Sequence, residues 1–203
     1  MKTNPKIQWM LDEIARGLEL DRSDKAAAMQ VFRSVLVEAE RLGVDSAYLR
    51  WVVAVTHDEL GALEMAWEEM EKSIAADPLS LPARRSFEII ADRVRAALRA
   101  PGRAVDDAST PRLYAMLIRA GEADLGAHVA MARFELATGR VAEARGLADA
   151  VVRLFPASRE AWSLLADVAR AQGDAVTAAS AGLEAASAGA LEPMFGVFGQ
   201  AKA

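Results

Sequence analysis

The chain has 203 residues, of which 53% are hydrophobic and 26% charged, and its formal net charge is -5 at pH 7. This composition supplies a sizeable core, which argues against global disorder. The acidic balance argues against a dedicated nucleic-acid binder, because neutralising phosphates requires concentrated positive charge. The absence of cysteine excludes disulfides, zinc–thiolate sites and cysteine nucleophiles.

Apolar residues recur at helical spacing along the first half of the chain. Glycines, prolines and capping residues bound the expected helices. They are one from Pro5 with an apolar stripe to Leu18, one from Ser23 or Asp24 to Gly43, one opening at Asp45 or Ser46, one within 61–78, and one from Pro82 to about Leu98.

The segment 100–110, APGRAVDDAST, interrupts this pattern with a Pro-Gly turn signal, small residues and two adjacent acids. Thr110-Pro111 then reads as a cap followed by the first residue of a helix. Helices are expected at about 111–120, 124–138, 141–154, 159–172 and 175–188. The sequence therefore predicts about ten helices and no strand.

An internal repeat is visible in the spacing of small residues, glycines and prolines. The hairpin expected over 125–158 contains Ala132, Gly139, Ala144 and Pro156. Subtracting 78 from these numbers gives the same residue types, namely Ala54, Gly61, Ala66 and Pro78. Adding 34 gives Ala166, Gly173 and Ala178, with a proline slightly late at Pro193. Small residues allow two helices to cross closely, glycine permits the turn between them, and proline stops the second helix.

A helix pair every 34 residues with this pattern resembles the tetratricopeptide repeat. Trp162, Leu165 and Ala166 are similar to the start of that family's first helix, and Ala66, Met70, Ser73 and Asp77-Pro78 to its second helix and closing turn. The resemblance implies an all-α fold, a right-handed α-solenoid of antiparallel helix hairpins.

The same resemblance suggests how the chain is organised. The expected segments are a weakly similar N-terminal hairpin or cap at 1–46, a repeat plus a degenerate repeat with the inserted loop 100–110 at 47–124, two repeats at 125–192, and an apolar C-terminal tail at 193–203.

First helices of this family line a concave groove that holds a peptide or helix of a partner protein. By register, the groove residues are expected to be Trp51, Val55, Glu59, Val129, Arg133, Leu136, Ser163, Asp167 and Arg170. The alternative is that some of them only pack or face solvent. The subtype that grips acidic chaperone tails with lysines and asparagines is disfavoured, because the one asparagine, Asn4, lies outside the clear repeats.

Charge is unevenly distributed between neighbouring helices. Residues 58–77 are strongly acidic, whereas 82–103 carry six arginines. A basic patch for an acidic partner or phosphate-bearing ligand would include Arg84, Arg85, Arg95 and Arg99. The competing interpretation, which we favour, is mutual screening of neighbouring helices.

Nothing in the sequence indicates catalysis. The only histidines are His57 and His128, and neither has a second histidine at helical metal-binding spacing. No phosphate loop or nucleophile elbow is present. His57 is expected to pack inside a hairpin. We therefore predict a non-enzymatic chain with no catalytic residue, cofactor or metal.

The ends of the chain offer two apolar features, Trp9 with Met10 and the tail 194–198. Solenoid ends need caps, so capping is favoured, and a homodimer contact or docking peptide is the alternative. No signal peptide or ~18-residue apolar run is present, so a cytoplasmic location without a membrane span is expected. The arginine- and alanine-rich composition suits a GC-rich bacterial genome.

These features predict a protein-interaction scaffold with a protein or peptide partner and no nucleic acid. A chaperone or targeting factor, similar to the small tetratricopeptide chaperones of bacterial secretion systems, is the alternative. A ligand-binding regulator is a more remote alternative.

Overall fold

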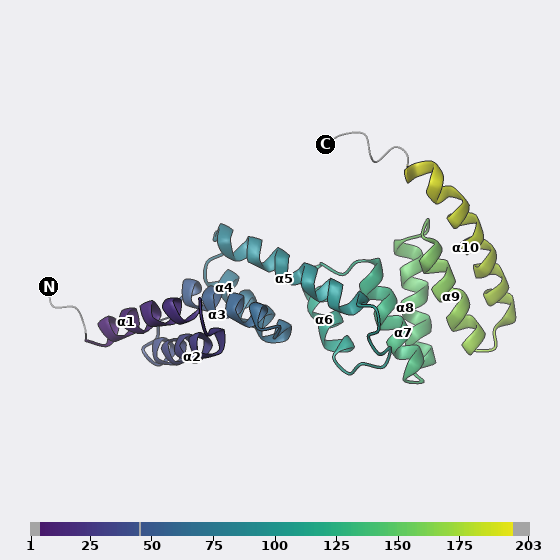
Figure 1. The fold of residues 1–203 in the computed structure, drawn as a ribbon. Coiled ribbons are helices and arrows are strands. Elements are labelled where there is room, and N and C mark those ends of the chain that lie inside the picture. Colours follow the sequence, from purple (N-terminus) through teal and green to yellow (C-terminus); the bar gives the residue numbers. More distant parts are fainter. Residues whose placement is uncertain (1–4, 45, 197–203) are drawn as a thin grey trace. The chain divides into compact units, whose positions relative to one another are not determined.

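The computed structural model describes residues 5–44 and 46–196, with side chains as far as residue 188. These residues form ten α-helices and no strand (Figure 1), which confirms the predicted all-α class. The helices are α1 (Pro5–Leu20), α2 (Lys25–Arg41), α3 (Ala47–Glu59), α4 (Leu63–Ala76), α5 (Leu81–Arg99), α6 (Thr110–Ala120), α7 (Leu125–Ala137), α8 (Val141–Leu154), α9 (Arg159–Ala171) and α10 (Ala175–Gly196).

The chain divides into two compact units, Met1–Val94 and Arg95–Ala203, and the division falls inside α5. In the first unit, α1 pairs with α2, α3 pairs with α4, and α2 packs against α3. Its hydrophobic core centres on Phe32, Val35, Leu49 and Val53. Phe32 is fully buried and lies so close to α1 that a Cβ on Gly17 would sit 2.4 Å from its Cε1 atom.

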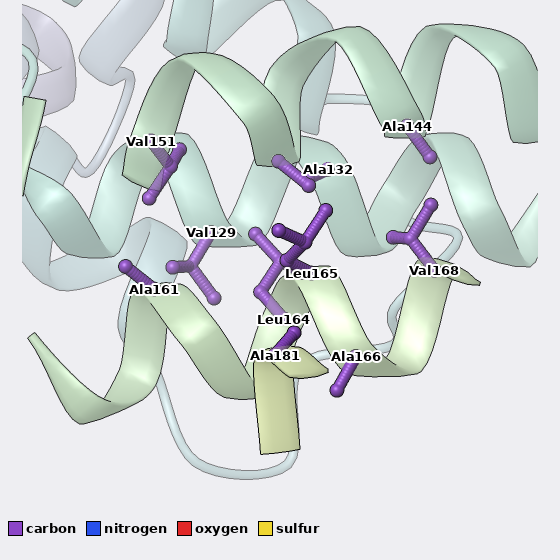
Figure 2. Packing of buried hydrophobic residues seen from close by; sticks show 11 residues of the cluster. Val129, Ala132, Ala144, Val151, Ala161, Leu164, Leu165, Ala166, Val168 and Ala181 are labelled. Carbon is purple, nitrogen blue, oxygen red and sulfur yellow. The ribbon is translucent and has the colours of Figure 1, made fainter. Parts of the chain in front are cut away.

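In the second unit, α7 pairs with α8, α9 pairs with α10, and α9 packs against both α7 and α8. Its core is built largely from alanine and branched aliphatic side chains, as Figure 2 shows. Leu164 and Leu165 of α9 meet Val129 and Ala132 of α7 and Ala181 of α10 there. Small side chains at these crossings let the helix axes approach closely.

The repeated glycines end the first helix of each hairpin. Gly61 and Gly139 have φ values of 76° and 79°, a region that residues with a Cβ rarely adopt. On the second helix of the earlier repeat, Trp67 and Met70 are completely buried. The 78-residue echo in the sequence therefore corresponds to two similar hairpins, α3–α4 and α7–α8.

The last helix differs from its expected bounds. α10 extends past the predicted end at 188 to Gly196 and includes Pro193. The alanine-rich segment before Pro193 has high helix propensity, and no glycine within it has the positive φ that Gly173 has in the turn between α9 and α10. The predicted apolar tail 194–198 lies partly in α10 and otherwise outside the described residues. Its predicted role as a cap therefore stays a prediction. None of the described helices is long and apolar enough to span a membrane.

Candidate functional site

A cavity of about 630 Å³ opens in the second unit. Its walls are the end of α5, the 100–110 segment and the start of α7, with contributions from the α8–α9 connection and α9. The lining residues are Leu98, Arg99, Ala100, Arg103, Ala104, Val105, Thr110, Asp124, Leu125, Gly126, Val129, Ala130, Arg133, Phe155 and Glu160. A volume of this size lies within the range of ligand-binding pockets.

Arg103 holds the 100–110 segment together. Its guanidinium donates to the carbonyl of Ala97 at 3.2 Å and to the Ser109 hydroxyl at 2.6 Å. It also donates to the Thr110 hydroxyl and pairs with Asp107 at 3.3 Å. Ala97 lies in α5 before the segment, and the other partners lie near the end of the segment, so one side chain joins its two ends.

Asp107 completes this arrangement. One carboxylate oxygen accepts hydrogen bonds from the backbone N–H and the hydroxyl of Ser109, both at 2.8 Å. These bonds, the backbone one first, lower the pKa of the Asp107 carboxyl. The inserted segment is therefore an ordered wall of the cavity.

The first turn of α7 forms the opposite wall. Asp124 caps this helix by accepting from the Ala127 N–H at 2.9 Å, and its second oxygen lies 3.2 Å from Arg99 Nη1. Gly126 leaves space for the Arg99 side chain, because an added Cβ would lie 2.5 Å from Arg99 Cδ. The glycine therefore lets an arginine from α5 lie across the start of α7.

Arg133 lies further along α7, in its second half, and faces Glu160 of α9. Its Nη2 atom is 3.9 Å from the nearer Glu160 oxygen, which is longer than a hydrogen bond. Both side chains are about half exposed, at 52% and 48%. This pair therefore contributes little to stability and leaves the arginine accessible.

Apolar side chains lie beside these charges. Val129 is buried at 2% exposure and belongs to the core, while Leu125 and Phe155 pack against that core and also line the cavity. Val105 of the inserted segment is 52% exposed. The cavity thus combines an apolar floor with charged walls.

The predicted groove residues do not form one cluster around this cavity. Val129 and Arg133 line it, while Leu136 packs against the core of the second unit. Asp167 and Arg170 are exposed on α9 and bond to each other at 2.6 Å, and Ser163 beside them is half-buried. Their role in partner binding stays a prediction.

Two of the three groove residues predicted in the first unit, Trp51 and Glu59, have partners of their own. The Trp51 indole N–H donates to the Ser86 hydroxyl at 3.0 Å, and its ring lies 5.6 Å from that of Tyr48. Glu59 pairs with Lys25, and Val55 is half-buried. These contacts match the packing alternative for Trp51, and partner binding there also stays a prediction.

The predicted basic patch is distributed over both units. In the first, Arg84 donates to the Pro78 carbonyl at 2.8 Å, and Arg85 is exposed. In the second, Arg95 pairs with Glu122 at 2.8 Å, and Arg99 lines the cavity. Arg93, on the same helix, pairs with the buried Asp58 at 2.8 Å. Intramolecular pairing of this kind is what the screening interpretation requires.

Both histidines are buried. His128 bonds through Nδ1 to the Tyr114 hydroxyl at 2.8 Å, a contact between α7 and α6. Burial lowers the pKa of His128, and the Asp124 carboxylate acts in the opposite direction. Burial, followed by the nearby Arg33 charge, also lowers the pKa of His57. Within the described residues, no group of three or more histidine, aspartate and glutamate side chains could hold a metal ion.

The comparisons with known proteins agree with the repeat pattern. Residues 125–168, which contain the α7–α8 hairpin and most of α9, match the model of the tetratricopeptide repeat family. This part of the chain is tetratricopeptide repeat. The family predicted from the glycine and proline spacing is thereby confirmed for these residues, and such repeats generally bind other proteins. No curated protein sequence matches the chain.

Several solved structures are similar to the chain at low identity. MamA from Desulfovibrio magneticus RS-1 is 13% identical with a TM-score of 0.39, covering 92% of this chain and 97% of that one. MamA MSR-1 is 15% identical with a TM-score of 0.42, covering 90% and 98%. A tetratricopeptide repeat protein from Parabacteroides merdae is 15% identical with a TM-score of 0.40, covering 88% and 64%.

Proposed function

We propose that the chain is a non-enzymatic scaffold that binds a segment of a partner protein in the cavity beside the 100–110 segment. The observation that carries this proposal is the cavity of about 630 Å³ next to the repeat, lined by Val129 and Arg133. Buried apolar anchors with a few charged groups are the usual source of affinity and specificity at protein interfaces.

The walls of the cavity offer both apolar and charged contacts to a partner segment. Leu125 and Phe155 provide apolar contact surface, while Arg99 and Arg133 provide donors at its edges. The inserted segment is tied to its own ends by Arg103, so a partner would meet a preformed wall. Binding to a preformed surface avoids part of the entropy cost of ordering it.

The first test is a pull-down with mass spectrometry using the wild-type chain and three variants. Ala130→Trp fills the cavity, Ala142→Trp places the same ring on an exposed position of α8, and Arg170→Glu changes the charge of α9 outside the cavity. We expect Ala130→Trp alone to lose specific partners, and titration calorimetry with a recovered partner to show at least a tenfold weaker affinity. The helical circular dichroism signal checks that each variant folds.

A partner list unchanged by Ala130→Trp would show that the cavity is not the binding site. Partners lost only with Arg170→Glu would move the site to the exposed face of α9. The chaperone role, the cytoplasmic location, and a homodimer through the N-terminal hairpin or C-terminal tail stay predictions.

A further inference from the structure

We propose that the cavity binds the apolar tail, residues 194–198, of a second copy of this chain. This inference rests on the proposed function and names the occupant of the cavity. It also gives a role to a run of apolar residues that neither the repeat pattern nor the lining of the cavity accounts for.

The three arginines that line the cavity each face a carboxylate. The pairs are Arg99 with Asp124 at 3.2 Å, Arg133 with Glu160 at 3.9 Å, and Arg103 with Asp107 at 3.3 Å. A charged occupant would have to compete with one of these pairs and give up part of its own hydration. An uncharged occupant does neither, so the balanced lining favours a segment without charge.

The apolar part of the lining is the surface that such a segment can cover. It consists of Leu98, Val105, Leu125, Val129 and Phe155. Covering these side chains removes apolar surface from water, which is the dominant favourable contribution in most protein association. A cavity of about 630 Å³ has the volume of a pocket for a drug-sized molecule, which is enough for more than one large side chain.

The tail has the composition that this lining requires. Residues 194–198 read MFGVF, which is two phenylalanines, a methionine, a valine and a glycine. Aromatic side chains and methionine are enriched in the buried centres of protein interfaces. The nearest charged residues, Glu192 and Lys202, lie outside the run. An uncharged apolar segment therefore matches an apolar floor whose charges are already balanced.

Helix α10 carries the tail away from the start of α9. The short turn at Gly173 makes these two helices antiparallel, and α10 has 22 residues whereas α9 has 13. About nine residues of α10 therefore extend past the start of α9, which is roughly 13 Å at ~1.5 Å per residue. Figure 1 shows this end of α10 beyond the first residues of α9.

The cavity lies on the other side of α9. Among the described residues, α10 packs against α9 alone, whereas the cavity is lined by α7 and by Glu160 at the start of α9. Packed helices lie about 8–10 Å apart, so a tail returning to its own cavity must cross about two such spacings. Val197 and Phe198 directly follow α10, and two residues span at most about 7 Å. The tail can therefore reach the cavity of a second copy but not its own.

The experiment measures self-association of the full chain by analytical ultracentrifugation, over about two decades of concentration around 10 μM. We expect the mean mass to rise with concentration above that of one chain. Val197→Asp with Phe198→Asp removes the anchors, and Ala130→Trp fills the cavity, so each should weaken self-association at least tenfold. Gly199→Asp with Gln200→Asp adds the same charge just beyond the tail and should keep it.

Mixing the two defective variants tests the contact directly. The Ala130→Trp chain keeps its tail, and the chain with Val197→Asp and Phe198→Asp keeps its cavity. An equimolar mixture should therefore form a one-to-one complex, although neither variant associates alone. Ala142→Trp, at an exposed position of α8 outside the cavity, is the matched control and should associate as wild type does.

A wild-type chain that stays monomeric over this range would overturn the inference. Self-association that is lost with the tail change but kept in Ala130→Trp would do the same, as would a mixture without the one-to-one complex. In each of these cases, a partner list altered by Ala130→Trp in the pull-down keeps the proposed function standing. Self-association and partner capture that both survive Ala130→Trp would contradict both proposals.

Discussion

The contact between Tyr114 and His128 shows how burial sets the charge of a single side chain. His128 is 9% exposed and bonded to the tyrosine hydroxyl, so its protonated form loses more hydration than it regains. Burial also raises the pKa of Tyr114, which keeps its hydroxyl neutral. Both groups are therefore uncharged at neutral pH. Fourteen residues separate them on two helices, so the sequence alone did not pair them.

We expect stability to fall as the pH drops below about 6.5. The pKa values of His57 and His128 lie below 6.5 in the folded chain, so the unfolded chain binds more protons between the folded and unfolded values. The stabilisation is complete above the unfolded pKa and decreases below it, by about 1.4 kcal/mol for each unit that separates the two values. Chemical denaturation between pH 7.5 and 5 measures this loss.

The double variant His57→Gln, His128→Gln should show a shallower dependence over the same range. An NMR titration gives the pKa of each imidazole directly. A histidine that titrates at or above 6.5 would show that burial does not control its protonation.

At the level of single helices, the local sequence was enough to predict most of the secondary structure. The 3.6-residue periodicity and the punctuating glycines depend on neighbouring residues, so the ten helices were predictable. The end of α10 was not predictable in this way. A proline usually indicates the end of a helix, but Pro193 lies inside α10. Gly17 gave no local signal either, since only the packing of α1 on α2 brings Phe32 against it.

Gly17→Ala should lower the free energy of unfolding by about 1–3 kcal/mol. The added methyl group would meet the Phe32 ring 2.4 Å away, and that ring is fully buried and cannot move freely. Gly146→Ala on α8 is the matched control, because no atom lies within 4 Å of its added Cβ. Helix propensity predicts that the control stabilises by up to ~1 kcal/mol. A Gly17→Ala chain as stable as wild type would refute the tight contact.

The candidate site was predictable only in part, for reasons that belong to tertiary structure. Val129 and Arg133 followed from helix register, and Arg99 from the arginine run. Phe155 and Glu160 escaped notice because the path of the chain between α8 and α9, which has no periodicity, brings them to the cavity. The structural role of Arg103 depends on the turns of the 100–110 segment, which composition does not specify.

Among the described residues, the hydrophobic cluster around Phe32 in the first unit and the cluster around Leu164 in the second share no residue. Phe32 belongs to the first and Leu164 to the second, and both are almost completely buried. In repeat proteins, stability is approximately a sum of each repeat's own stability and its contacts with its neighbours. A cavity made in one core should therefore act mainly on the helices around it.

Phe32→Ala should cost about 3–5 kcal/mol and accelerate amide hydrogen exchange in α2 and α3, with little effect on α7 to α9. Leu164→Ala should cost about 2–5 kcal/mol and give the reverse pattern. Exchange followed by mass spectrometry distinguishes the two. Equal acceleration in all helices after either change would show that the chain unfolds as one cooperative body.

The contact between Arg99 and Gly126 links two positions that are 27 residues apart. A larger side chain at 126 would meet the Arg99 side chain, while glycine inside a helix has a cost to helix stability of its own. A Cβ at 126 would require the outer part of the half-exposed Arg99 side chain to move away from the first turn of α7, whereas a residue shorter than arginine at 99 would leave room for that Cβ.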